Sequence, residues 1–146
     1  MPKNHFHFIG VGGIGMSALA MGLLKKGYSV SGSDLVKNNE TNKLEKLGAI
    51  IFNSQIGQNI EFITSKFNNK LINFVVSTAI KPENEELMYC REKNLPVKHR
   101  SEILALLMQS YNTLAVAGTH GKTSTSTFLS TLLELCTHNS SSITGG

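Results

Sequence analysis

The sequence predicts an α/β fold with a mostly parallel sheet and helices on both of its faces. Short β-branched or aromatic runs alternate with segments of helical periodicity along the chain. Two glycine-rich loops each follow a predicted strand and precede a predicted helix. The 146 residues are 40% hydrophobic and 16% charged, so the chain has enough apolar surface for a folded core. Regular strand–helix alternation favours a sheet of parallel strands joined by helical crossovers.

The first part of the chain supplies three strands and two helices. Residues 5–9 are short, aromatic and β-branched, and the glycine that follows them ends the predicted strand. Apolar residues recur at helical spacing over residues 16–26, and the next glycine ends that helix. Residues 28–33 and 49–52 are predicted strands, and a short helix between them spans residues 41–47.

The alternation continues through the second part of the chain. Helices are predicted over residues 60–67, 83–93, 101–109 and 122–135, and Ser101 is the expected N-cap of the third of these. Strands are predicted over residues 74–77 and 113–117, with a short extended piece at residues 96–98.

The sequence predicts only structural roles for two histidines and both cysteines. His5 and His7 alternate along the first strand, and we expect both on an exposed face. Cys90 and Cys136 are too far apart in the sequence for a C-x-x-C motif. We expect them to be buried, reduced thiols.

Composition and charge exclude several classes of protein. The net charge of +4 and the pI of about 9.1 suit an anionic ligand, but the basic residues are too scattered for a nucleic-acid-binding stripe. No apolar run approaches the roughly 20 residues that cross a bilayer, so we expect no membrane insertion. The first residues lack the apolar stretch of a signal peptide, which predicts a cytoplasmic protein.

The first glycine loop satisfies G-x-G-x-x-G between a predicted strand and a predicted helix. Its candidate ligand-binding residues are Gly10, Gly12, Gly13, Gly15, Met16 and Ser17. Glycines let the backbone approach a diphosphate, and the helix N-terminus offers free N–H groups. Asp34 follows the second strand, where an acidic residue usually meets a ribose hydroxyl. The alternatives are a tight turn without a ligand, and a turn or capping role for Asp34.

The second glycine loop, G-T-H-G-K-T-S, is a shortened form of a P-loop. Its candidate ATP-binding residues are Gly118, Thr119, His120, Gly121, Lys122, Thr123 and Ser124. Backbone N–H groups cradle phosphates in such loops, Lys122 brings a positive charge, and the Thr123 hydroxyl can reach Mg²⁺. A lysine at a helix start has few structural explanations, because the helix dipole disfavours a cation there. His120 either touches the nucleotide or merely fills the loop.

Together the two loops resemble the Mur ligase family. The matching segments are H-F-I-G-V-G-G-I-G-M-S-A-L-A from His7, S-G-S-D from Ser31, S-T-A-I from Ser77 and V-A-G-T-H-G-K-T-S-T from Val116. They occur in the family's order and extend along nearly the whole chain. The match is best to the members that add L-alanine.

This resemblance implies a fold, an activity and a set of ligands. It implies a Rossmann-like domain over residues 1–110 that binds UDP-N-acetylmuramate through the first loop, Asp34 and Ser77. It implies that residues 111–146 begin a central P-loop ATPase domain, with Lys122 as a catalytic residue. The expected reaction uses ATP and Mg²⁺ to join L-alanine to UDP-N-acetylmuramate through an acyl phosphate, in peptidoglycan precursor synthesis.

The chain is shorter than the three-domain members of the family. We therefore expect that this chain by itself does not ligate alanine. Apolar residues of the last helix, such as Phe128, Leu132 and Leu135, would pack on the first domain, self-associate or fray. Residues after about Tyr111 should then be less protected than the rest.

Three other functions stay open at this stage. A nicotinamide-dependent oxidoreductase would use the first loop and Asp34, but it leaves the second loop without a role. A non-catalytic UDP-sugar-binding module shares the ligand and differs only in turnover. A related ligase that attaches a recycled peptide to UDP-N-acetylmuramate would also carry both loops.

Overall fold

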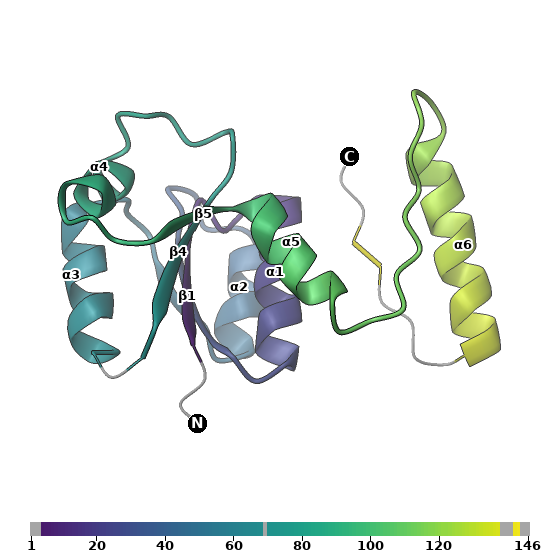
Figure 1. The fold of residues 1–146 in the computed structure, drawn as a ribbon, viewed down its shortest axis with the longest axis horizontal. Helices are drawn as coiled ribbons and strands as arrows, with labels where there is room; N and C mark the ends of the chain where they lie inside the picture. The colour runs from purple at the N-terminus through teal and green to yellow at the C-terminus, as the bar shows by residue number, and fades with distance from the viewer. Residues whose placement is uncertain (1–3, 69, 138–141, 144–146) are drawn as a thin grey trace. The chain divides into compact units, whose positions relative to one another are not determined.

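The computed structural model describes residues 4–68, 70–137, 142 and 143. The chain divides into two compact units, Met1–Ser110 and Tyr111–Gly146. The first unit contains a five-stranded parallel sheet (Figure 1). No helix among the described residues is long and apolar enough to cross a membrane.

The sheet has the strand order β3-β2-β1-β4-β5. Its strands are β1 (His5–Ile9), β2 (Ser29–Ser33), β3 (Ile50–Phe52), β4 (Ile72–Val76) and β5 (Val97–His99). The chain winds outward from β1 to β3, then crosses back to β4 on the other side of β1. This reversal places a topological switch point between the carboxyl ends of β1 and β4. The prediction of a parallel α/β sheet is therefore confirmed.

Helices cover both faces of the sheet (Figure 1). One set contains α1 (Ile14–Lys25), α2 (Asn39–Lys46) and α5 (Arg100–Met108), and α1 contacts both of the others. The other set contains α3 (Gly57–Lys66) and α4 (Glu85–Glu92), which pack against each other. Every predicted helix of this unit is present, with bounds that differ by one to three residues.

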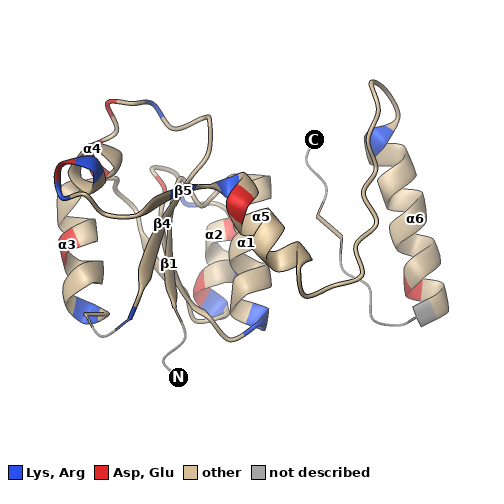
Figure 2. Ribbon diagram, in the orientation of Figure 1, with Lys and Arg blue, Asp and Glu red and all other residues tan. Residues whose placement is uncertain are grey.

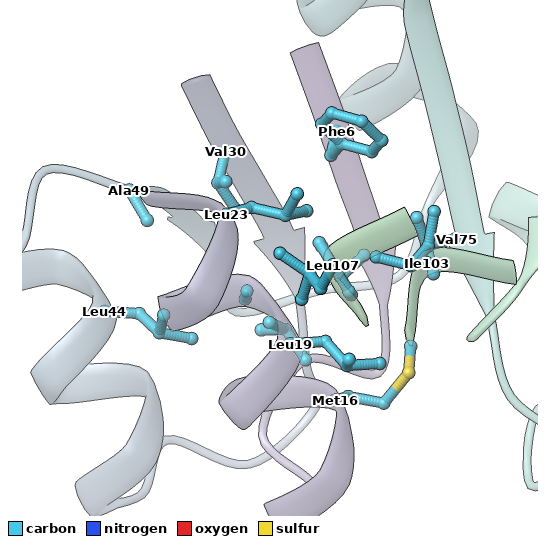
Figure 3. Close-up of a cluster of buried hydrophobic side chains, with 13 residues drawn as sticks. Phe6, Met16, Leu19, Leu23, Val30, Leu44, Ala49, Val75, Ile103 and Leu107 are labelled. Carbon is cyan, nitrogen blue, oxygen red and sulfur yellow. The ribbon is translucent and has the colours of Figure 1, made fainter. Parts of the chain in front are cut away.

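Both faces of the sheet bury apolar side chains. Phe6, Phe8, Val30 and Val75 pack with residues of α1, α2 and α5 in the main hydrophobic core (Figure 3). That core is completed by Met16, Leu19, Leu23, Leu44, Ile103 and Leu107, among others. On the opposite face, Ile60, Phe74 and Cys90 form a smaller apolar cluster. Burial of these side chains on both faces fixes the strand register, since a shift by one residue would exchange the faces.

The expectation that His5 and His7 lie on an exposed face is wrong. Both side chains are fully buried on the sheet face opposite Phe6 and Phe8. Alternation along a strand predicts that these residues share a face, but it does not show whether helices cover that face. Here α3 and α4 cover it, because the crossovers from β3 to β4 and from β4 to β5 lie on that side.

Two further local predictions need correction. Ser101 is not the N-cap of α5: the cap is His99, and Glu102 completes a capping box by accepting the His99 N–H at 2.8 Å. Cys136 is exposed, whereas Cys90 is buried as expected. An imidazole nitrogen can act as the cap acceptor, and it is a less common cap than serine.

The second unit contains α6 (Lys122–Thr137). The strand predicted over residues 113–117 is absent, because no described segment pairs with these residues. A β-strand needs a neighbour for its N–H and C=O groups, so apolar β-branched composition alone does not produce one.

Candidate functional site

The first glycine loop connects β1 to α1 at the carboxyl edge of the sheet. Gly10 adopts φ +79°, a conformation that favours glycine. The N–H groups of Gly10 and Val11 both donate to the Ser33 carbonyl, at 2.8 and 2.9 Å. The start of the loop is therefore fixed to the end of β2.

Close packing also explains Gly32, the glycine of the S-G-S-D motif. A Cβ on Gly32 would lie 2.6 Å from the Cβ of Val11 in the loop. Val11 is fully buried, so it has no space into which it can move away. Gly32 is thus required for the loop to lie directly on β2.

The α1 helix begins without a side-chain cap. Gly13 is its N-cap residue and makes no side-chain hydrogen bond, and the first turn contains no acidic residue. The first backbone N–H groups of a helix have no partner within the helix. This terminus can therefore donate several hydrogen bonds to an anion at the switch point.

Met16 and Ser17 can contribute to this site only in a restricted way. The Met16 side chain belongs to the main core. Ser17 is fully buried, and its hydroxyl donates to the Ile14 carbonyl at 3.0 Å. In this conformation Met16 can offer a backbone N–H group, whereas the Ser17 hydroxyl is already engaged by the helix.

Asp34 holds the glycine loop from its position just after β2. One of its carboxylate oxygens accepts the Gly12 N–H at 2.8 Å, and the other accepts the Val36 N–H at 3.1 Å. The Asn38 amide donates to the Gly12 carbonyl at 3.0 Å, so Gly12 is bound through both of its backbone groups. The structure thus shows a turn role for Asp34, and its predicted contact with a nucleoside stays a prediction.

The residues after β4 meet the same loop. Ser77 directly follows β4, and its carbonyl accepts the Ile80 N–H at 3.2 Å. The side chain of Ile80 approaches Gly10 closely, with its Cδ1 only 2.8 Å from where a Cβ would stand. Ser77 and the glycine loop therefore lie on the two sides of the switch point, as their positions in the sequence predict.

A buried polar network supports the β2 end of the site, and no sequence motif predicted it. Glu86 on α4 is fully buried and accepts hydrogen bonds from the Ser33 hydroxyl and, at 2.7 Å, from the Asn59 amide. His7 Nε2 lies 3.6 Å from the same carboxylate. Ser33 is also the residue whose carbonyl binds the loop, so the network fixes the loop's anchor.

The network continues along β1 and β2. The Ser31 hydroxyl shares hydrogen bonds with His5 Nε2 at 2.8 Å and with His7 Nδ1 at 2.7 Å. Burial, together with the nearby His7 and Lys70, lowers the pKa of His5 to about 3. His5 is therefore neutral at physiological pH, and it stacks on the Phe67 ring at 3.9 Å between centroids.

The second glycine loop lies in the second unit and is exposed. Gly121 adopts φ +73° directly before α6, which begins at Lys122. The Lys122 ammonium folds back across the loop and donates to the Gly118 carbonyl at 2.7 Å. His120 Nδ1 lies 3.2 Å from the Thr119 hydroxyl. The predicted ATP-binding residues thus form one exposed loop at a helix N-terminus.

No three His, Cys, Asp or Glu side chains gather as a metal site in the part of the chain that the structure describes. Among the predicted residues, Thr123 is the one assigned to a metal. Its backbone carbonyl accepts the Thr127 hydroxyl at 2.9 Å within α6.

Curated relatives resemble this chain along almost its full length. It is 70% identical over 144 residues to a UDP-N-acetylmuramate–L-alanine ligase of Prochlorococcus marinus subsp. pastoris. The aligned region covers 99% of this chain and 30% of that protein. A ligase of the same name from Nostoc punctiforme is 48% identical over 88% of this chain. The chain spans about 30% of the length of the curated relatives it matches.

Solved structures show the same fold. A murein peptide ligase from Psychrobacter arcticus aligns with a TM-score of 0.80 and 28% identity, covering 92% of this chain and 27% of that one. A UDP-N-acetylmuramate–alanine ligase from Thermotoga maritima aligns with a TM-score of 0.74 and 29% identity. That alignment covers 89% of this chain and 29% of the Thermotoga chain. The sequence model described as "Mur ligase family, catalytic domain" matches residues 5–112. Since this match covers most of the chain and the fold agrees, the chain belongs to the Mur ligase family.

Proposed function

We propose that this chain is part of an ATP-dependent ligase that joins L-alanine to UDP-N-acetylmuramate in peptidoglycan precursor synthesis. The observation that carries the proposal is the 70% identity, over 99% of this chain, to a protein of that name. A solved murein peptide ligase and a solved alanine ligase are almost equally similar to this chain, at 28% and 29% identity, so the preference for the alanine-adding function rests on the curated relatives. Both functions would use the same nucleotide substrate in the cytoplasm.

We assign binding of UDP-N-acetylmuramate to residues 1–110. The uncapped N-terminus of α1 would receive the diphosphate, because its N–H groups and partial positive charge suit an anion. Asp34 and Ser77 would lie near the nucleoside and the rest of the ligand. Leu35 and Val36 follow Asp34 and are 70% and 65% exposed, so they offer an apolar surface to a base.

We assign ATP to the loop Gly118–Ser124 and Mg²⁺ partly to Thr123. ATP would supply the phosphoryl group that activates the lactyl carboxylate, which the alanine amine then attacks with loss of phosphate. Lys122 would exchange its bond to the Gly118 carbonyl for phosphate oxygens and neutralise their charge. The positive φ of Gly121 and the helix start at Lys122 fit this role.

Calorimetric titration of the 146-residue chain with UDP-N-acetylmuramate tests the proposal. We expect saturable binding at one site per chain and no binding of NADH. Lys122→Ala should leave this affinity within about twofold while abolishing any binding of ATP with Mg²⁺, because the two loops serve different ligands. Binding of NADH without binding of UDP-N-acetylmuramate would reject the proposal in favour of a nicotinamide enzyme.

A further inference from the structure

Arg100 is a charged residue outside both glycine loops. It is the first residue of α5 and directly follows β5. Its Nη1 atom lies 2.6 Å from the position that a Cβ on Gly15 would occupy, in the first turn of α1. The guanidinium therefore rests on the backbone of the first glycine loop, and the absence of a side chain at Gly15 makes room for it.

Arg100 lies close to Gly15 because α5 and α1 pack against each other on the same face of the sheet. Leu107 of α5 packs over Gly22 of α1, at 3.1 Å from where a Cβ would stand. Both helices follow parallel strands, so both begin at the carboxyl edge of the sheet. Figure 2 shows positive residues at the β5–α5 junction and an acidic residue in the first turn of α5.

The electrostatic setting of Arg100 favours an anion. A helix N-terminus carries partial positive charge, and Arg100 lies at the first turns of both α1 and α5. The Glu102 carboxylate is already bound to the His99 N–H. The Arg100 side chain makes no hydrogen bond or ion pair with another described residue. The Arg100 guanidinium thus adds a positive charge beside the uncapped N-terminus of α1, while the carboxylates of Glu102 and Asp34 are bound to backbone N–H groups.

We propose that Arg100 binds the diphosphate of the nucleotide substrate, together with the N–H groups at the start of α1. This inference rests on the function proposed above. A guanidinium can donate two parallel hydrogen bonds to phosphate oxygens, and a lysine ammonium cannot reproduce that geometry. Arg100 would thereby hold the diphosphate from the side of α5, opposite the Asp34 side of the loop.

Titrations with UDP-N-acetylmuramate and with UDP, on three variants, test the assignment. Arg100→Ala should raise the Kd for both ligands about 10- to 100-fold, since a charged hydrogen-bond donor is lost. Arg100→Lys should recover part of this loss. Lys98→Ala removes an equal charge two residues away and should stay within about twofold. Added NaCl should weaken binding less in Arg100→Ala than in the unmodified chain.

The outcomes separate this inference from the proposed function. Unchanged affinity of Arg100→Ala, with tight binding by the unmodified chain, would overturn the role of Arg100 and leave the proposed function intact. A loss seen with UDP-N-acetylmuramate but not with UDP would place the contact on the sugar and overturn the diphosphate assignment. No binding by the unmodified chain would overturn both. Arg100 is exposed, so circular dichroism should show that Arg100→Ala folds normally.

Discussion

At the scale of single residues, a buried polar network adds to the smaller hydrophobic cluster on the sheet face that α3 and α4 cover. His5, His7 and Glu86 are fully buried, and their contacts run through Ser31 and the Ser33 side chain. Hydrogen bonds stabilise such groups, because each unsatisfied polar atom costs about 1–3 kcal/mol, and His7 Nε2 instead lies 3.6 Å from the Glu86 carboxylate. The network therefore fixes Ser33, whose carbonyl binds the glycine loop.

His5 makes the free energy of unfolding depend on pH, and the sign of that dependence can be measured. Its pKa is about 3 in the folded chain and 6.5 in the unfolded chain, so between these values the unfolded chain binds more protons. Its contribution to stability is complete above pH 6.5 and falls as the pH decreases toward 3. Urea unfolding at several pH values should show a slope of up to about 1.4 kcal/mol per pH unit from this group.

The matched variant for this measurement is His5→Gln, which keeps a polar side chain but does not titrate. The difference between the two stability–pH curves isolates His5, because all other groups are common to both. The difference should grow as the pH falls from 6.5 to 5. Parallel curves over that range would show that His5 titrates normally in the folded chain.

At the scale of elements, the N-termini of the helices divide into capped and uncapped ones. Asn38 caps α2 and Asn84 caps α4 through their side chains, and His99 caps α5. The α1 and α3 termini lack such a cap, and the α1 terminus follows the glycine loop. A helix whose free N–H groups face the switch point can bind an anion there. A side-chain cap would compete with the anion for the same N–H groups.

The capping box of α5 provides the test at this scale. Glu102→Ala removes the acceptor of the His99 N–H and should lower the free energy of unfolding by about 0.5–2 kcal/mol. Glu102→Gln keeps an acceptor oxygen and should retain most of that stability. Urea denaturation of both variants measures the effect, and equal losses would show that the carboxylate charge, not the hydrogen bond, stabilises the terminus.

At the scale of the whole molecule, the two units have different means of stabilisation. The first has a hydrophobic cluster on each face of its sheet, and the face with the smaller cluster also buries a polar network. In the second, the apolar residues Phe128, Leu132 and Leu135 of α6 are 67%, 41% and 71% exposed. Burial of apolar surface is the main source of stability, so α6 should open more readily than the sheet.

Hydrogen–deuterium exchange followed by mass spectrometry measures this difference. Peptides that contain β1 and β4 should exchange slower than peptides of α6 by roughly two orders of magnitude or more. Addition of UDP-N-acetylmuramate should slow exchange in the first glycine loop and leave α6 unchanged. Equal protection of α6 and β1 in the free chain would contradict this account.

The sequence by itself determined the order of elements, the parallel sheet and the positions of both glycine loops. These depend on local signals: hydrophobic periodicity, glycines at element ends, and glycine loops between a strand and a helix. They also placed Asp34 and Ser77 at the carboxyl edge of the sheet, since each follows a strand. Local signals wrongly predicted a strand over residues 113–117, because these residues have no strand to pair with among the described residues.

The tertiary structure decided which faces are covered and which distant residues meet. His5 and His7 are buried because α3 and α4 cross over their face, and Glu86 reaches Ser33 from 53 positions away. Arg100 reaches Gly15 because α5 packs on α1. Such contacts depend on crossover side and helix packing, which no short stretch of sequence encodes. The glycine loop could therefore be predicted from its sequence, whereas its supporting and charged neighbours could not.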